Sequence, residues 1–201
     1  MGATTVASGK TTTLTIASRG TTTGSAITIT VKATCASDTT KTASITITQA
    51  ANTLTWANPV ITATTPVNFS AVNQSYDLSS KTSVKQTGTY SSGSTTSGTV
   101  TRTYKVATAA TGFSLSSSTV SVTNNESTST RGSFVVTITA TGNSKSSSVN
   151  VTFTQSAGSI VYSAWQISTL TASATSIGAS GGTSTLTVVC RRPYKWNNTG
   201  T

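Results

Sequence analysis

Two similar segments lie 106 residues apart and divide the chain into repeat units. ITITQAANTLTW occupies residues 45–56 and VTFTQSAGSIVY occupies residues 151–162, so that Gln155 follows Gln49 by 106 residues. This spacing is about the length of one β-sandwich domain. One complete unit therefore fits between the two copies, and 201 residues leave room for a partial unit on either side.

Serine and threonine dominate the composition. Charged residues make up 8% of the chain and hydrophobic residues 34%, so it resembles neither a charge-rich disordered segment nor a membrane protein. Threonine is β-branched and here alternates with Val, Ile and Leu, as in residues 27–31 and 135–138. Clusters of Gly, Asn and Ser interrupt these runs about every ten residues, which is typical of a sandwich. We expect an all-β chain without helices.

The patterning predicts one complete immunoglobulin-like β-sandwich over residues 51–158, flanked by partial units at 1–50 and 159–201. Residues 90–98 contain no apolar residue after Tyr90 and are expected to form a loop. The strands of the complete unit are expected near residues 61–63, 75–78, 83–87, 99–107, 119–122, 133–139 and 148–154.

The two flanking pieces resemble opposite halves of the complete unit. Residues 27–33 align with residues 134–140, so the first piece is expected to hold late strands. The last piece repeats the Thr-Ala pair of the early strands, as Thr171-Ala172. A rival alignment matches residues 3–16 with residues 174–188, and it would make the first unit a short but complete sandwich.

Three arrangements follow from the split unit. The last piece of one copy could pair with the first piece of the next, which gives a head-to-tail filament or ring of copies of this chain. Both pieces could instead pair within one chain. The 201 residues could also be a segment of a longer tandem-repeat protein.

The formal net charge is +10, from 13 Lys and Arg against 3 Asp and Glu. Most basic residues are spread singly, as expected for solubilising residues at strand edges. No nucleic-acid-binding motif accompanies the charge, so nucleic acid is not expected as a partner. One cluster combines basic and aromatic residues near the end of the chain: Arg191, Arg192, Tyr194, Lys195 and Trp196. We expect it to dock on a neighbour or to contact a glycan.

Other aromatic residues recur at the unit boundaries. Trp56 and Tyr162 occupy the same place after each TQ segment, and Trp165 follows closely. All three are expected to pack at domain junctions.

The two cysteines, Cys35 and Cys190, lie one in each partial unit. A lone cysteine often serves as a small buried hydrophobe. The alternative is a disulfide, because Cys190 follows an early strand and Cys35 follows a late one, and a sandwich bridge joins such strands across its sheets. A disulfide of this kind would staple the composite of the two end pieces.

The segment ASATSIGASGGTSTLTVV, residues 172–189, and the repeat endings SITITQA and NVTFTQS resemble bacterial immunoglobulin-like domains of the BACON type. These domains occur in tandem in secreted glycan-degrading enzymes and surface adhesins of Bacteroidetes, and in virion proteins of their phages. The resemblance implies display, spacing or weak adhesion, with host-surface glycans or other virion or surface proteins as partners. It makes Trp196 the counterpart of a tryptophan that such domains carry after the first long strand.

The chain has few side chains of the kinds that act as catalytic acids, bases or metal ligands. The chain has no histidine, and its three carboxylates, Asp38, Asp77 and Glu126, are widely separated. No GxSxG or phosphate-binding loop occurs, and no acidic cluster could bind calcium. We expect no enzyme activity, no metal and no cofactor.

No apolar run is long enough to cross a membrane, and no secretory signal is apparent at the start of the sequence. The expected location is therefore a virion or an extracellular or cell surface.

Overall fold

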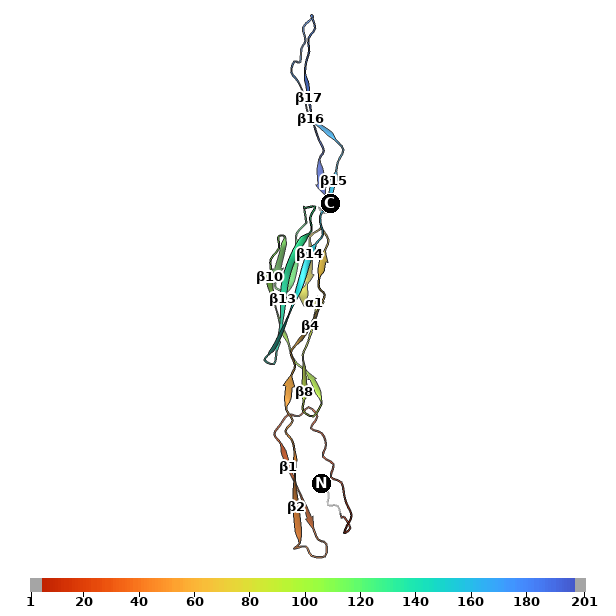
Figure 1. Ribbon diagram of the computed structural model, residues 1–201, viewed down its shortest axis with the longest axis vertical. Coiled ribbons are helices and arrows are strands. Elements are labelled where there is room, and N and C mark those ends of the chain that lie inside the picture. Colours follow the sequence, from red (N-terminus) through yellow and green to blue (C-terminus); the bar gives the residue numbers. More distant parts are fainter. Residues whose placement is uncertain (1–4, 198–201) are drawn as a thin grey trace. The chain divides into compact units, whose positions relative to one another are not determined.

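The computed structural model describes residues 5–197, and these form an all-β chain (Figure 1). Residues 1–4 and 198–201, the extremes of the two expected partial units, lie outside the described part. The strands are β1 (Ile27–Thr34), β2 (Thr42–Gln49), β3 (Leu54–Trp56), β4 (Val60–Ala63), β5 (Val67–Phe69), β6 (Gln74–Asp77), β7 (Thr82–Lys85), β8 (Thr87–Tyr90), β9 (Thr95–Ser97), β10 (Thr101–Thr108), β11 (Phe113–Ser116), β12 (Thr119–Val122), β13 (Arg131–Gly142), β14 (Lys145–Gln155), β15 (Ile160–Tyr162), β16 (Gln166–Ala172), β17 (Leu186–Arg191) and β18 (Tyr194–Trp196). One short helix, α1 (Leu78–Lys81), interrupts them.

The chain divides into two compact units. The first contains the residues up to Val60, Lys85–Thr101 and Thr141–Ser147. The second contains Ile61–Val84, Arg102–Ala140 and the residues from Ser148 onward. Each unit is thus built from segments that are far apart in the sequence.

In the first unit, β1 and β2 form a two-stranded antiparallel ribbon, and β3, β8 and β9 form a three-stranded antiparallel sheet. The side chain of Asn52 fixes the chain just before β3. Its Nδ2 donates to the carbonyl oxygens of Gly20 and Thr22, both at 3.0 Å. The Ser91 hydroxyl donates to Asn52 Oδ1 at 3.0 Å, which connects this residue to the segment after β8.

The second unit contains two sheets that share one hydrophobic core. One sheet has the order β10-β13-β14-β5, with β5 parallel to β14, and the other has the order β11-β12-β6. Alternate residues of β13 are buried while their neighbours are less so, as the two-residue period of a strand requires. This arrangement is that of a β-sandwich, as the sequence predicts.

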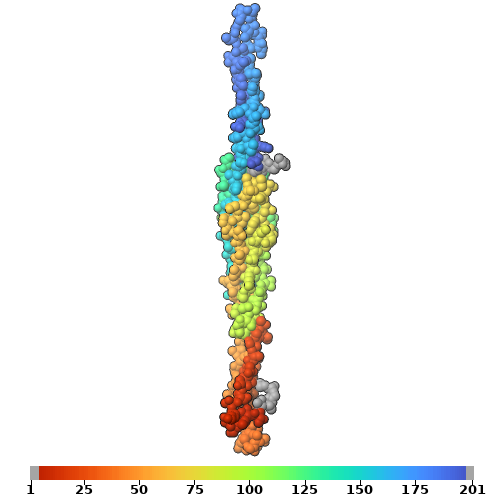
Figure 2. Space-filling view, turned by 90° about the vertical axis from the view of Figure 1, so that its right-hand side faces the viewer, coloured from red at the N-terminus to blue at the C-terminus, as the bar shows by residue number. Residues whose placement is uncertain are grey.

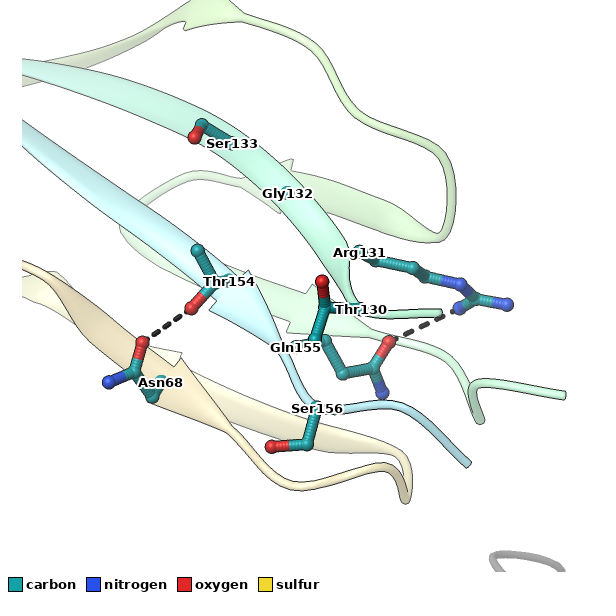
Figure 3. A pocket seen from close by; sticks show the side chains of 8 residues that line it. All are labelled: Asn68, Thr130, Arg131, Gly132, Ser133, Thr154, Gln155 and Ser156. Atoms are coloured by element: carbon teal, nitrogen blue, oxygen red, sulfur yellow. Dashed lines mark hydrogen bonds between the residues drawn. The ribbon is translucent and has the colours of Figure 1, made fainter. Parts of the chain in front are cut away.

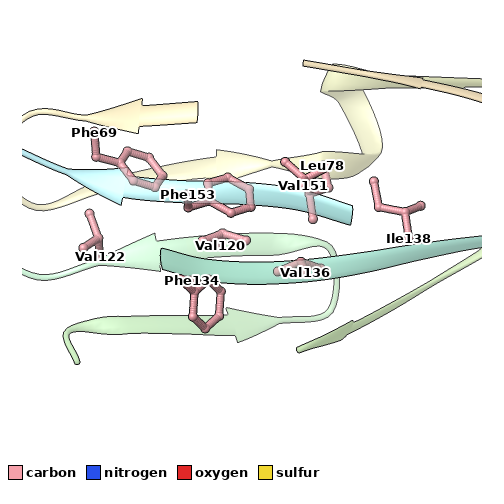
Figure 4. Close-up of a cluster of buried hydrophobic side chains, with 9 residues drawn as sticks. All are labelled: Phe69, Leu78, Val120, Val122, Phe134, Val136, Ile138, Val151 and Phe153. Carbon is pink, nitrogen blue, oxygen red and sulfur yellow. The ribbon is translucent and has the colours of Figure 1, made fainter. Parts of the chain in front are cut away.

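Aromatic rings fill the core of the second unit (Figure 4). The ring of Phe153 stacks on Phe69 at 5.8 Å and meets Tyr76 edge-on at 5.7 Å between centroids. The fully or nearly buried apolar side chains of this core are Phe69, Leu78, Val120, Val122, Phe134, Val136, Ile138, Val151 and Phe153.

Two further ribbons belong to the second unit. β15 pairs with β18, and β16 pairs with β17, both antiparallel. Figure 2 shows the surface of the β16–β17 ribbon in blue.

The expected strands of the complete unit coincide with β4, β6, β7, β10, β12, β13 and β14, and β12 has the expected bounds. The expected loop at residues 90–98 is wrong in part, because it contains β9, which pairs with β8 through the backbone without apolar side chains. The expected absence of helix is also wrong for one turn. Asp77 accepts a hydrogen bond from the Ser79 N–H at 2.9 Å and so caps α1.

Candidate functional site

The end of the chain repeats a strand pairing of the first unit. In the β3–β8 ladder, Leu54 pairs with Tyr90. In the β15–β18 ladder, Ile160 pairs with Trp196, and both residues lie 106 positions later in the sequence. The register is therefore the same in both ladders.

Backbone hydrogen bonds beside these ladders repeat at the same interval. The N–H of Ser91 donates to the carbonyl of Thr53 at 2.9 Å, and 106 residues later the N–H of Asn197 donates to the carbonyl of Ser159 at 2.8 Å. These bonds show that residues 159–197 rebuild the early part of the repeat.

A side-chain bond repeats as well, with a change of residue. Gln86 donates through Nε2 to the carbonyl of Ala57 at 2.9 Å. Arg192, which is 106 residues later, donates through Nε to the carbonyl of Ser163 at 3.1 Å. Gln86 and Arg192 thus occupy equivalent positions.

The beginning of the chain repeats the late part of the unit. Gln49 donates through Nε2 to the carbonyl of Ala17 at 2.8 Å. Gln155 donates through Nε2 to the carbonyl of Thr123 at 2.9 Å, so donor and acceptor are again both 106 residues apart. Residues 17–49 therefore correspond to residues 123–155.

A second pair supports this correspondence. The guanidinium of Arg19 donates to the carbonyl of Ala50 at 3.3 Å, and the amide of Asn125 donates to the carbonyl of Ser156 at 2.9 Å. The rival alignment required a complete sandwich in the first piece. The described residues before Ala50 contain only β1 and β2, which are too few strands for one.

Equivalent ribbons differ sharply in burial. In β14, Val151 and Phe153 are fully buried. Their counterparts in β2, 106 residues earlier, are Ile45, which is 63% exposed, and Ile47, which is half-buried. The apolar side chains of the β1–β2 ribbon are thus less buried than the equivalent side chains of the second unit.

The β16–β17 ribbon exposes apolar side chains along its whole length. Ile167 is 65% exposed and Leu186 is 64% exposed. Leu170, Val188 and Val189 are exposed in the same ribbon. A two-stranded ribbon with such side chains is only marginally stable alone in water, so we treat it as an interaction surface.

The two cysteines are free thiols, and both are exposed. Cys35 Sγ lies 3.1 Å from the hydroxyl oxygen of Ser37, and this hydrogen bond is the main cause that lowers the pKa of the Cys35 thiol below its ordinary value. Cys190 lies in β17, opposite Ile167. The interpretation of each cysteine as a small buried hydrophobe is therefore wrong, and the disulfide stays a prediction.

The structure gathers part of the basic and aromatic cluster around Tyr162. The guanidinium carbon of Arg192 lies 4.8 Å from the Tyr162 ring centroid, and the ring of Tyr194 meets it edge-on at 6.1 Å. Arg191, at the end of β17, and Lys195, in β18, are exposed, while Trp196 is half-buried.

The expected junction aromatics have different surroundings. The ring of Trp56 closely approaches Gly88 of β8, where an added Cβ would be only 2.8 Å from the ring, so Trp56 packs within the β3–β8 sheet. Trp165 is 68% exposed.

A shallow pocket lies over β13, β14 and β5 in the second unit (Figure 3). Its polar groups bond to one another, since Arg131 reaches Oε1 of Gln155 at 3.3 Å and the Thr154 hydroxyl donates to Oδ1 of Asn68. The lining residues are Asn68, Thr130, Arg131, Gly132, Ser133, Thr154, Gln155 and Ser156. They include no carboxylate and no nucleophile–base pair.

Two carboxylates, those of Asp38 and Asp77, hold local structure. Asp38 accepts from the N–H and hydroxyl of Thr40, at 3.0 and 2.6 Å. Hydroxyl donors around Asp77, first Ser118 and then Ser79, hold the pKa of that carboxyl far below its usual range. Among residues 5–197, no three His, Cys, Asp or Glu side chains gather where they could bind a metal ion.

The chain matches no protein-family model, no curated protein and no solved structure. In the described residues, no helix has the length and apolar character needed to cross a membrane.

Proposed function

We propose that this chain is a non-enzymatic structural or display protein of a virion or an extracellular surface fibre. Its immunoglobulin-like units, of the kind that the BACON resemblance suggests, assemble by exchanging strands between partial units. The observation that carries the proposal is the burial contrast: Val151 is enclosed in the second unit, whereas its counterpart Ile45 in β2 is exposed, as is Leu186 in the β16–β17 ribbon.

The two end pieces are complementary halves. The β1–β2 ribbon corresponds to β13–β14, and the β15–β18 ladder corresponds to β3–β8. The β16–β17 ribbon follows β15 as the β4–β7 pair follows β3. A late half from one copy can therefore cover an early half from the next copy.

The driving force is the burial of apolar surface. Each square ångström removed from water stabilises the assembly by about 25 cal/mol, before the entropy of association is subtracted. Because the first piece of one copy meets the last piece of another, the contact is heterologous and extends to filaments or closed rings.

Light scattering after size-exclusion chromatography, over a range of concentrations, tests this proposal. We expect species larger than the 20.3 kDa monomer whose share rises with concentration. Leu186→Asp, which puts a charge on the open ribbon, should shift the chain towards monomer. A 20.3 kDa monomer at every concentration would contradict the proposal and favour a fragment or a chain closed on itself.

A carbohydrate-binding or adhesin role is the second candidate. It is favoured by the exposed aromatic residues near the end of the chain, since Tyr194 is 59% exposed and Trp165 even more so. Sugar rings stack on such faces. Glycan arrays with the unaltered chain, Tyr194→Ala and Trp196→Ala test it, and an absence of binding that depends on these residues would exclude it.

A further inference from the structure

The turn between β13 and β14 is connected to the β3–β8 sheet by one buried side chain. Gln86 donates through Nε2 to the carbonyl of Gly142 at 2.8 Å and to that of Ala57 at 2.9 Å. Its Oε1 accepts from Nδ2 of Asn143 at 2.9 Å. All these residues belong to the first unit. Gln86 thus joins the early part of the repeat to the turn of the late part.

Arg192 occupies the Gln86 position in the last piece and reproduces one of these three hydrogen bonds. Its Nε bond to the Ser163 carbonyl reproduces the bond of Gln86 to Ala57. No other hydrogen bond of Arg192 is present within residues 5–197, although a guanidinium carries further N–H donors on its terminal nitrogens. The contact that Gln86 makes with a turn is therefore missing at Arg192.

The equivalent turn in the first piece is the seven-residue segment Cys35–Lys41, between β1 and β2. The backbone bond from Cys35 N–H to the Lys41 carbonyl, at 2.9 Å, closes it. Asp38 lies at its centre and is exposed. The side chain of Thr40 is the main cause that holds the pKa of Asp38 below its ordinary value, so this carboxylate is charged at neutral pH.

These replacements are complementary in charge. A neutral glutamine facing a neutral turn in the complete unit becomes an arginine in one end piece and, in the other, a loop with the carboxylate of Asp38 at its centre and Lys41 at its end. Only three carboxylates occur in a chain of net charge +10, and one of them, Asp38, lies in this loop next to Ser37, the counterpart of Asn143. A carboxylate and a guanidinium form strong, oriented hydrogen bonds, which select the correct partner as well as hold it.

Building on the function proposed above, we propose that Arg192 of one copy binds Asp38 in the Cys35–Lys41 loop of a second copy. The pair takes the place of the contact between Gln86 and the β13–β14 turn. It sets the register of the head-to-tail contact and favours this pairing over others between the same ribbons.

Charge reversal tests the pair. Arg192→Glu and Asp38→Lys should each raise the concentration needed for half-assembly at least about tenfold in analytical ultracentrifugation. Lys105→Glu and Glu126→Lys are the matched controls, because they make the same charge changes at exposed positions elsewhere. Each control should change that concentration less than about threefold. Equal effects of the variants and their controls would overturn the pair.

Mixing the two reversed chains separates contacts between copies from contacts within one chain. Each reversed chain alone carries two like charges at the junction. In an equimolar mixture, every junction between unlike chains joins opposite charges, so assembly should return to within about threefold of the unaltered chain. If the mixture needs as high a concentration for half-assembly as either reversed chain alone, a contact between copies is contradicted. If the unaltered chain does not assemble, the proposed function fails; if it assembles and charge reversal has no specific effect, only this inference fails.

Discussion

Gln155 donates through Nε2 to the carbonyl oxygen of Thr123 at 2.9 Å, from a side chain that is almost fully buried. It also reaches the carbonyls of Ala71 and Val72, at 3.2 and 3.3 Å. One glutamine therefore satisfies backbone acceptors on two loops of the second unit. Within residues 5–197, the side chain of the equivalent Gln49 makes one hydrogen bond, to Ala17, at an exposed site.

This difference predicts unequal costs of replacing the two glutamines. Gln155→Leu should lower the free energy of unfolding by about 2–3 kcal/mol, because it removes three part-buried hydrogen bonds to backbone carbonyls and the Oε1 that accepts from Arg131. Gln49→Leu should cost less than about 1 kcal/mol, because water replaces its one bond. Urea denaturation followed by circular dichroism measures both. Similar losses would show that the two positions are equally enclosed.

The core makes a similar prediction for apolar side chains. Phe153→Ala should destabilise the second unit by about 3–5 kcal/mol, because Phe153 is fully buried against Phe69, Tyr76 and Phe134. Ile47→Ala, at the equivalent position of the open β1–β2 ribbon, should cost about 1 kcal/mol or less in the monomer. Denaturation of dilute chains tests this contrast, and a large loss for Ile47→Ala would mean that the ribbon is already covered.

The pKa of Asp77 predicts a pH dependence. Its folded-state pKa is held below the unfolded value, so its contribution to stability is fully present above that unfolded value and is lost as the pH falls through the folded one. Asp77→Asn should therefore be less stable than the unaltered chain at pH 7. The gap should narrow below about pH 4, where an unfolded aspartate takes up its proton. A gap that is constant from pH 7 to pH 3 would exclude the linkage.

Much of the strand pattern could be predicted because threonine and aliphatic residues alternate wherever one face is buried. β12, with Val120 and Val122 buried and the residues beside them less so, is such a case. β9 could not be predicted, since Thr95–Ser97 carries no apolar residue and pairs with β8 through its backbone. α1 could not be predicted, because a single turn is too short to show a helical period in the sequence. Its one sequence signal is Asp77, a residue type that often caps the start of a helix.

The candidate site was only partly visible in the sequence. The 106-residue spacing predicted complementary end pieces, and aromatic and basic residues near Arg192 suggested a docking surface. The role of Gln86 was missed, because a single glutamine in a polar chain carries no pattern. The signal was its position: adding the repeat length to Gln86 leads to Arg192, and subtracting it from Gly142 and Asn143 leads into the loop of Asp38.

The candidate disulfide gives the most direct test of assembly between copies. Chains with natural nitrogen and chains labelled with nitrogen-15 are mixed in equal amounts and oxidised with oxidised glutathione, which accepts the two electrons from the thiols. They are then digested and analysed by mass spectrometry. We predict peptides that join Cys35 to Cys190, about half of them with one labelled and one unlabelled partner. Assembly through the two end pieces would be contradicted if no Cys35–Cys190 peptides are found. It would also be contradicted if both partners in every such peptide carry the same nitrogen isotope.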